Sequence, residues 1–181
     1  MRAPVFFQSK VERLERAGDL SGIIAVLADR SDKTYERAHA AKALADHADR
    51  LGTLSDPAVA VLMLVADEAS EVRKWALFAL AELREPTALP AFRRAAVDRD
   101  WMIRIFAAHG FDRLRSHDSL VEVVSLLGDR ESGVREAAAA ALASIGDGRA
   151  RPLLQRTATT DPYPWVREAA REALETLRQT G

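Results

Sequence analysis

The 181 residues suffice for one domain or for one short array of repeats. Hydrophobic residues make up 48% of the chain but aromatic residues only 6%, a composition that favours an all-α protein and argues against a β-sandwich or barrel. The formal net charge of −1 removes the strongest argument for a nucleic-acid binder, and the absence of cysteine excludes disulfides, thiolate metal sites and a cysteine nucleophile.

The N-terminal part predicts a pair of helices, over residues 5–17 and 19–28, which are separated at Gly18-Asp19. Its first residues lack the apolar segment of a secretory signal, and no apolar run in the sequence approaches the ~18 residues of a membrane span. We therefore expect a cytoplasmic protein without membrane contact.

A pattern of Asp, a β-branched residue and Arg at offsets 0, 5 and 6 recurs four times along the rest of the chain. The anchors lie 31, 31 and 32 residues apart, at Asp67, Asp98, Asp129 and Asp161. The corresponding arginines are Arg73, Arg104, Arg135 and Arg167. A weaker fifth copy, which begins at Ser31, keeps the Arg and the small residues but lacks the Asp anchor. Self-similarity at this period is typical of a helical repeat array.

Each copy predicts two helices joined by a short turn. In the first helix, apolar or small residues at offsets 5, 9, 12, 13 and 16 form one stripe, as in Val134, Ala138, Ala141, Leu142 and Ile145. Alanine or glycine at offsets 9 and 12 lets a neighbouring helix approach closely. N-cap residues are expected at the starts of three first helices, at Ser70, Asp100 and Ser132.

The sequence thus predicts five helix pairs and a final lone helix over residues 165–179. We expect a single domain, with an N-terminal pair (1–30), four repeats (31–66, 67–97, 98–128 and 129–160) and a terminal helix (161–181). Because no pair can bury its apolar faces alone, the pairs should stack into an all-α solenoid.

This pattern resembles the HEAT repeat, and more closely the short PBS-lyase-type HEAT-like repeat, over about residues 31–178. Tetratricopeptide and ankyrin signatures are absent from the sequence. The resemblance implies a right-handed, armadillo-like superhelix that acts as a scaffold or protein-binding module. It also implies that the first helices form the convex face and the second helices the concave face.

Six residues of the second helices are the candidate partner-binding residues, namely Arg93, Arg94, Glu122, Ser125, Gln155 and Arg156. Arg94 and Arg156 occupy equivalent positions two repeats apart, so they should project in the same direction, with Glu122 and Ser125 between them. We expect an arginine-rich strip on the concave face that binds an acidic segment of another protein. A solvated helix face is the alternative interpretation.

The repeated Asp and Arg residues also have two interpretations, a charged binding strip or a set of structural ion pairs. Recurrence in every copy favours the structural interpretation, because stacking requires the same contacts at each repeat. The three tryptophans are expected to be mostly buried, at Trp75, Trp101 and Trp165. For Trp101 and Trp165 an exposed aromatic anchor is the alternative interpretation.

No pattern in the sequence predicts a catalytic, cofactor or metal site. The spacing of the four histidines does not match a metal site, at His39, His47, His109 and His117. Residues 146–148 form a Gly-Asp-Gly turn between helices rather than a phosphate-binding loop, and no spacing singles out a catalytic triad.

The leading functional hypothesis is a non-enzymatic scaffold that binds another protein and needs no cofactor. Two alternatives stay open: a nucleic-acid-binding helical-repeat protein, and an accessory factor in the maturation of a cofactor-carrying protein. A nucleic-acid-binding protein would need a basic groove, which here would be formed by Arg93, Arg94, Arg156, Trp101 and Asp112. The net charge of −1 argues against nucleic acid, whereas a continuous positive groove would favour it.

Overall fold

The structure, a computed structural model, describes residues 9–47 and 69–179. Within these two ranges 81% of the residues are helical and none forms a strand. The expected all-α fold is therefore confirmed. The second helix expected within residues 31–66, and the anchor Asp67, lie outside the described residues.

The described α-helices match the predicted order of first and second helices. They are α1 (Lys10–Ala17), α2 (Leu20–Ala28), α3 (Thr34–Asp46), α6 (Ser70–Glu82), α7 (Leu89–Ala95), α8 (Trp101–Leu114), α9 (Leu120–Leu127), α10 (Ser132–Ile145), α11 (Arg151–Thr160) and α12 (Pro164–Gln179). One 3₁₀ turn precedes each of α7, α9 and α11, over Pro86–Ala88, His117–Ser119 and Gly148–Ala150. None of these helices is long and apolar enough to cross a membrane.

Side-chain caps set the starts of several helices, α1 and α8 among them, whereas two other starts differ from the expectation. α1 begins after Ser9, because Ser9 and Glu12 form a capping box in which each side chain accepts the other's backbone N–H, at 3.0 and 3.2 Å. Residues 5–8 of the expected helix lie outside the described residues. Asp100 caps α8 as expected, accepting an amide at 3.0 Å. Ser70 and Ser132 are instead the first residues of α6 and α10, and the residues before them make no side-chain cap.

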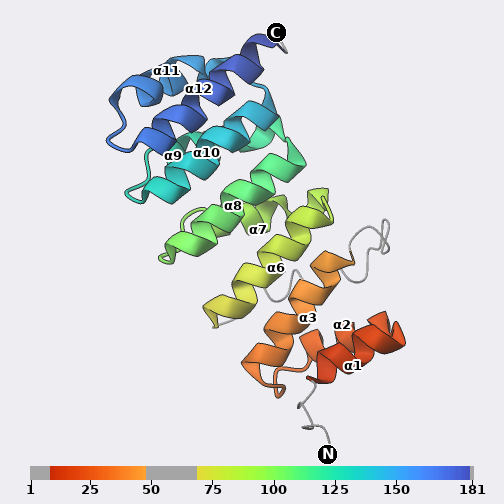
Figure 1. Cartoon of the computed structure of the whole chain (residues 1–181). Helices are drawn as coiled ribbons and strands as arrows, with labels where there is room; N and C mark the ends of the chain where they lie inside the picture. Colours follow the sequence, from red (N-terminus) through yellow and green to blue (C-terminus); the bar gives the residue numbers. More distant parts are fainter. Residues whose placement is uncertain (1–8, 48–68, 180–181) are drawn as a thin grey trace, which may run out of the picture.

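The first helices of the repeats form a continuous stack. Figure 1 shows α3, α6, α8, α10 and α12 side by side along the array, and each packs directly on the next. The second helices pack mainly on the first helix of the following repeat, so that α7 lies on α8, α9 on α10 and α11 on α12. The terminal helix α12 is therefore not isolated, because it packs on both α10 and α11.

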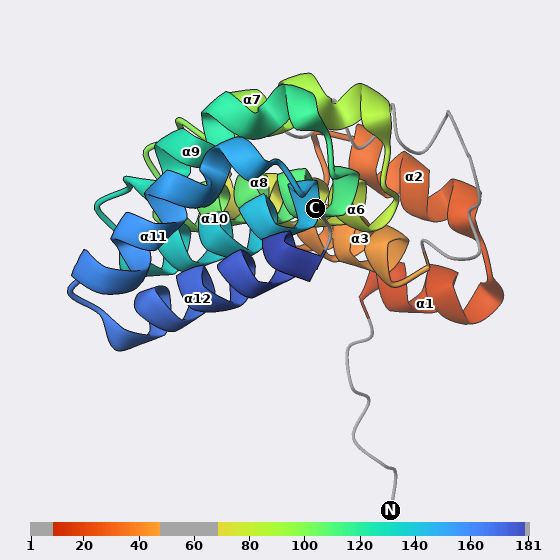
Figure 2. The same ribbon diagram turned by 90° about the horizontal axis from the view of Figure 1, so that it is seen from above.

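The array curves toward the first helices. In Figure 2, α2, α7, α9 and α11 lie along the outer arc, and α3, α6, α8 and α10 lie inside it. The first helices contact one another extensively, whereas the described second helices make far fewer contacts among themselves, and the more closely spaced layer becomes the inner one. The expectation that the second helices form the concave face is therefore wrong: they form the outer face.

Small residues let the two layers approach each other closely. Gly110 of α8 lies against the fully buried ring of Phe92 of α7, and a Cβ at position 110 would come within 2.2 Å of that ring. The same ring meets Phe111 edge-on, with the ring centroids 6.2 Å apart. The predicted close approach at offset 12 is confirmed in this repeat.

The Asp/Arg pattern forms a ladder of ion pairs between successive repeats. Arg104 donates to both carboxylate oxygens of Asp129, from Nε at 2.6 Å and from Nη2 at 2.8 Å. Arg135 donates to Asp161 in the same way, at 2.7 and 3.0 Å. Each of these arginines thus pairs with the Asp that begins the next repeat, in a bidentate geometry that favours strong, oriented bonds.

The ladder arginines also fix the turn before their own helix. Nη1 of Arg135 donates to the carbonyl of Asp129 at 2.8 Å, Nη1 of Arg167 donates to the carbonyl of Asp161 at 2.7 Å, and Arg104 makes the equivalent bond. Arg167, at the last repeat, has no following Asp among the described residues to pair with. These contacts support the structural interpretation of the pattern.

The ladder should make folding stability depend on pH below about pH 4. The Arg135 guanidinium holds the pKa of Asp161 below its ordinary value and outweighs the opposing effect of burial. Because this pKa is lower in the folded chain than in the unfolded one, the stabilisation is fully present above the unfolded pKa of about 3.9 and is lost as the pH falls through the folded pKa.

Urea unfolding measured between pH 7 and about pH 3 checks this expectation. The wild-type chain should lose stability steeply below about pH 4, and Asp161→Asn, which cannot ionise, should lose less of its remaining stability over the same interval. If the free energies of unfolding of the two chains fell in parallel as the pH is lowered, the ion pair of Asp161 would not be the source of the pH dependence.

Candidate functional site

The outer face carries a pocket between α9 and α11. Its volume is about 300 Å³, and it is lined by Val124, Leu127, Gly128, Leu153, Arg156 and Thr157. The second helices are spaced more widely than the first ones, and this spacing leaves room for the pocket. The pocket combines apolar walls with one guanidinium group, which suits a segment that presents both an apolar and an acidic side chain.

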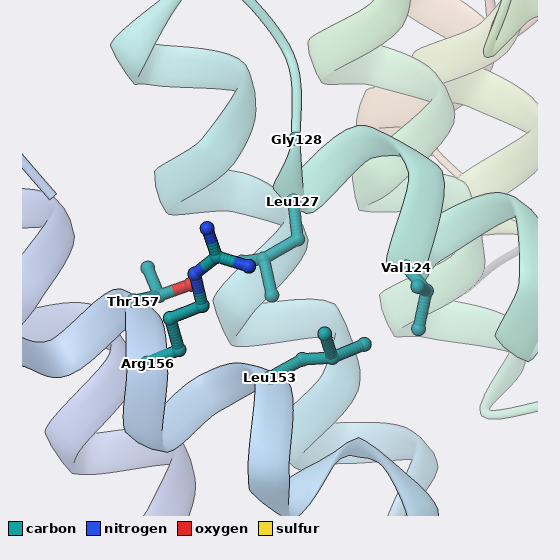
Figure 3. A pocket seen from close by; sticks show the side chains of 6 residues that line it. All are labelled: Val124, Leu127, Gly128, Leu153, Arg156 and Thr157. Carbon is teal, nitrogen blue, oxygen red and sulfur yellow. The ribbon is translucent and has the colours of Figure 1, made fainter. Parts of the chain in front are cut away.

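Figure 3 shows how the two helices contribute to this pocket. Arg156 and Thr157 lie together on α11, and the Arg156 side chain extends toward Leu127 of α9. Leu153, one turn earlier on α11, lies between Arg156 and Val124. Arg156 is exposed, and no ion pair joins it to another residue in the described ranges.

The structure divides the expected arginine strip into free and paired residues. Arg93 of α7 is held by α9 and by the 3₁₀ turn before it: its Nε lies 2.8 Å from Glu122 of α9, and its Nη2 donates to the carbonyl of Asp118 in the turn at 2.7 Å. In this ion pair the charges of Arg93 and Glu122 compensate each other. Arg94 is exposed on α7 and makes no ion pair with any described residue, so Arg94 and Arg156 supply the available positive charge.

Ser125 and Gln155 are exposed on α9 and α11, as their predicted places on the second helices require. Neither of them lines the pocket, which brings Arg156 together with apolar residues instead. Nearby arginines are structural: Arg149 pairs with Asp147 at 2.6 Å and holds the pKa of that carboxyl far below its ordinary value. Arg151 donates to the carbonyl of Leu177 in α12.

The outer face also carries exposed apolar side chains that the predicted arginine strip does not include. Leu153 is 39% exposed and Val121 is 78% exposed, both on second helices. A signal for them was present, because adjacent apolar pairs such as Val123-Val124 and Leu153-Leu154 cannot both face the core of one helix. In each pair one member is buried and the other lies at the pocket.

The residues of the nucleic-acid alternative do not meet in one groove. Arg156 lines the outer pocket, whereas Asp112 of α8 lies in a separate groove of the inner layer. The structure therefore does not assemble this set into one site. No group of three metal-ligating side chains occurs within the described ranges.

The tryptophans are more exposed than expected. Trp101 is the first residue of α8 and Trp165 the second residue of α12. They are 46% and 48% exposed, so the prediction that they are mostly buried is wrong. Both lie in the first turn of their helix, at the edge of the array, where they are only partly covered. Trp75 is half-buried and meets Phe78 edge-on, with the ring centroids 5.8 Å apart.

Comparisons with known proteins agree with this architecture. A family model of HEAT repeats matches residues 57–122 and 97–175, which together cover more than half of the chain. The sequence has no match among curated proteins.

Several solved structures have a similar fold. The complex of CpcE and CpcF of phycocyanin lyase from Nostoc sp. PCC7120 matches with a TM-score of 0.80 and 23% identity, over 99% of this chain and 70% of that chain. A designed armadillo repeat protein in complex with the peptide (KR)4 matches with a TM-score of 0.75 and 21% identity, over 92% and 85% of the two chains. At these identities the similarity shows a solenoid fold of the HEAT and armadillo type.

Proposed function

Because the chain belongs to the HEAT repeat family, we propose that it is a non-enzymatic scaffold that binds an acidic, partly apolar segment of another protein on its outer face. The repeat solenoid fits a protein-interaction function in general. The finer proposal names the α7, α9 and α11 face, with Arg94 and Arg156 as the charged residues and the α9/α11 pocket as the apolar contact.

The observation that carries this proposal is the position of Arg156 at the edge of an apolar pocket. A guanidinium group beside Val124 and Leu153 can pair with a carboxylate while the pocket takes the partner's adjacent apolar side chain. Arg94, at the equivalent position two repeats earlier, repeats the charge along the face. Arg93 and Glu122 serve this surface by holding α7 against α9.

The accessory-factor alternative receives its support from one structural neighbour, which is named as a complex of phycocyanin lyase subunits. That neighbour shares 23% identity with this chain, so the likeness bears on fold alone. An acidic segment on a client protein would use the same outer face, and the experiment below applies to both cases.

We expect the outer face to bind a short amphipathic peptide that places leucine on one helical face and glutamate on the other. Arg94→Glu combined with Arg156→Glu should weaken this binding at least about tenfold, because both free positive charges are reversed. Fluorescence anisotropy with the labelled leucine–glutamate peptide measures the effect. Both side chains are exposed, so the variant should keep the circular dichroism spectrum of the wild type.

The matched control is Arg130→Glu combined with Arg178→Glu, which reverses two other exposed arginines, outside α7, α9 and α11. It changes the net charge by the same amount and should leave peptide binding within about twofold of the wild type. Equal loss in both double variants would show that net charge alone attracts the peptide and would refute the proposed face.

A further inference from the structure

The inner layer holds a second groove that the outer-face proposal does not use. It runs across α6, α8 and α10, has a volume of about 280 Å³, and is lined by Phe78, Ile105, Phe106, His109, Asp112, Ala137 and Ala140. Its walls are almost entirely apolar apart from Asp112 and the imidazole of His109. It therefore differs in chemistry from the arginine-bearing pocket of the outer face.

Aromatic side chains build one wall of this groove. Phe78 of α6 meets Phe106 edge-on at 6.1 Å between centroids, and it stacks on His109 of α8 at 5.6 Å. These side chains are only half-buried, so the rings are held in place and yet reachable from solvent. Such preorganised apolar surface can accept a partner's side chain with little loss of conformational entropy.

The opposite wall of the groove is formed by small side chains. α10 contributes Ala137 and Ala140, whose side chains are single methyl groups, and Ala140 is exposed. The height difference between the aromatic wall on α6 and α8 and the alanine wall on α10 forms the recess. A partner's apolar side chain can fill it and cover the half-buried rings.

The charge around this groove is acidic. Asp112 lies in the groove, Glu136 is exposed on α10, and no ion pair joins either carboxylate to another residue of the described part of the chain. Glu82 is compensated within the layer, because His109 lies 3.0 Å from it and Arg113 lies 3.1 Å from it. The groove thus offers unpaired negative charge beside its apolar walls, and a basic group would complement it.

We propose that the inner groove of α6, α8 and α10 is a second interaction surface, which binds a partner segment carrying an apolar side chain next to a lysine or arginine. The apolar side chain lies between Phe106 and Ala140, and the basic group pairs with Asp112. The two faces of the solenoid then select partners of opposite charge, so that one chain can join two different proteins. This surface does not depend on the outer-face proposal.

The test uses a labelled amphipathic peptide with leucine on one helical face and lysine on the other, in fluorescence anisotropy against the whole chain. Asp112→Asn should weaken binding about tenfold, because it removes the carboxylate and keeps the side-chain shape. Ala140→Arg should reduce binding by more than about a hundredfold, since it fills the recess and places a positive charge there.

Matched controls separate this proposal from general charge effects and from the outer face. Ala25→Arg adds the same side chain at an exposed position of α2 and should leave binding unchanged. Arg94→Glu with Arg156→Glu should also leave leucine–lysine binding unchanged, so that a failure of one face is distinguishable from a failure of the other. A peptide with serine in place of leucine should bind at least about tenfold more weakly.

Three results would overturn the inner-groove proposal. The first is that Ala140→Arg binds the leucine–lysine peptide as tightly as the wild type does. The second is that Ala25→Arg loses as much affinity for this peptide as Ala140→Arg. The third is that the wild type binds the leucine–lysine and serine–lysine peptides equally tightly. The circular dichroism spectrum of each variant confirms folding, and Asp112→Asn keeps the test valid if Ala140→Arg fails to fold.

Discussion

Replacing Arg135 with alanine is expected to lower the free energy of unfolding by about 3–5 kcal/mol. The side chains of Arg135 and Asp161 are only 11% and 6% exposed, and the substitution leaves the carboxylate buried without its partner. It also removes two bonds from Nη1 to the carbonyls of Asp129 and Arg130, which fix the turn before α10. Urea unfolding followed by circular dichroism measures the loss.

Arg167→Ala is the matched control for the ladder. Arg167 makes the same two carbonyl contacts, to Asp161 and Pro162, but has no carboxylate partner in a following repeat among the described residues. Its replacement should therefore cost only about 1 kcal/mol. If both substitutions cost the same, the ion pair between repeats would contribute nothing beyond the carbonyl contacts.

Gly110→Ala is expected to destabilise the chain by about 1–3 kcal/mol, although alanine is the better helix former by about 1 kcal/mol. The new methyl group would lie 2.2 Å from the ring of Phe92, which is fully buried and cannot move aside freely. Overpacking should therefore outweigh the gain in helix propensity. The measurement is again urea unfolding, with a lower midpoint at an unchanged slope.

Gly133→Ala provides the comparison for this second prediction. A Cβ at position 133 would meet only the flexible end of Ile105 at 3.3 Å and Trp101 at 4.0 Å. The substitution should therefore be close to neutral or slightly stabilising. If Gly110→Ala were as harmless as Gly133→Ala, the close packing of α7 on α8 would not limit stability.

Much of the fold could be predicted from the sequence, because the repeat pattern is local. The Asp anchors and the stripe of apolar residues predict the first helices, and the fixed offset between Asp129 and Arg135 indicates a contact that recurs at every repeat. The sequence pattern does not determine which carboxylate each Arg contacts, within its own repeat or in the next one. The structure shows that Arg135 pairs with Asp161 of the next repeat, which only the stacking geometry determines.

The curvature of the array could not be predicted from offsets within one repeat. It depends on the distance between successive helices of each layer, and the alanine-rich first helices pack more closely than the second helices. The wrong assignment of the concave face follows from applying the family's layer order to these helices. The small residues at offsets 9 and 12, such as the fully buried Ala138 and Ala141 of α10, are the sequence feature that lets the first helices pack closely.

The candidate site was only partly predictable, because charge is visible in a sequence and pairing between helices is not. Arg94 and Arg156 could be placed on one face from their equivalent positions. The pairing of Arg93 with Glu122 depends on how far apart α7 and α9 lie. The apolar pocket beside Arg156 likewise arises from the spacing of α9 and α11.

The most direct test of the outer-face account is a two-dimensional NMR titration of the ¹⁵N-labelled chain with the leucine–glutamate peptide. If the peptide binds the outer face, the amide signals of residues around the pocket should shift progressively, above all those of Val124, Leu153 and Thr157. The signals of the inner groove, such as that of Ala140, should stay in place. Shifts confined to α6, α8 and α10, or no shifts at saturating peptide, would contradict the account.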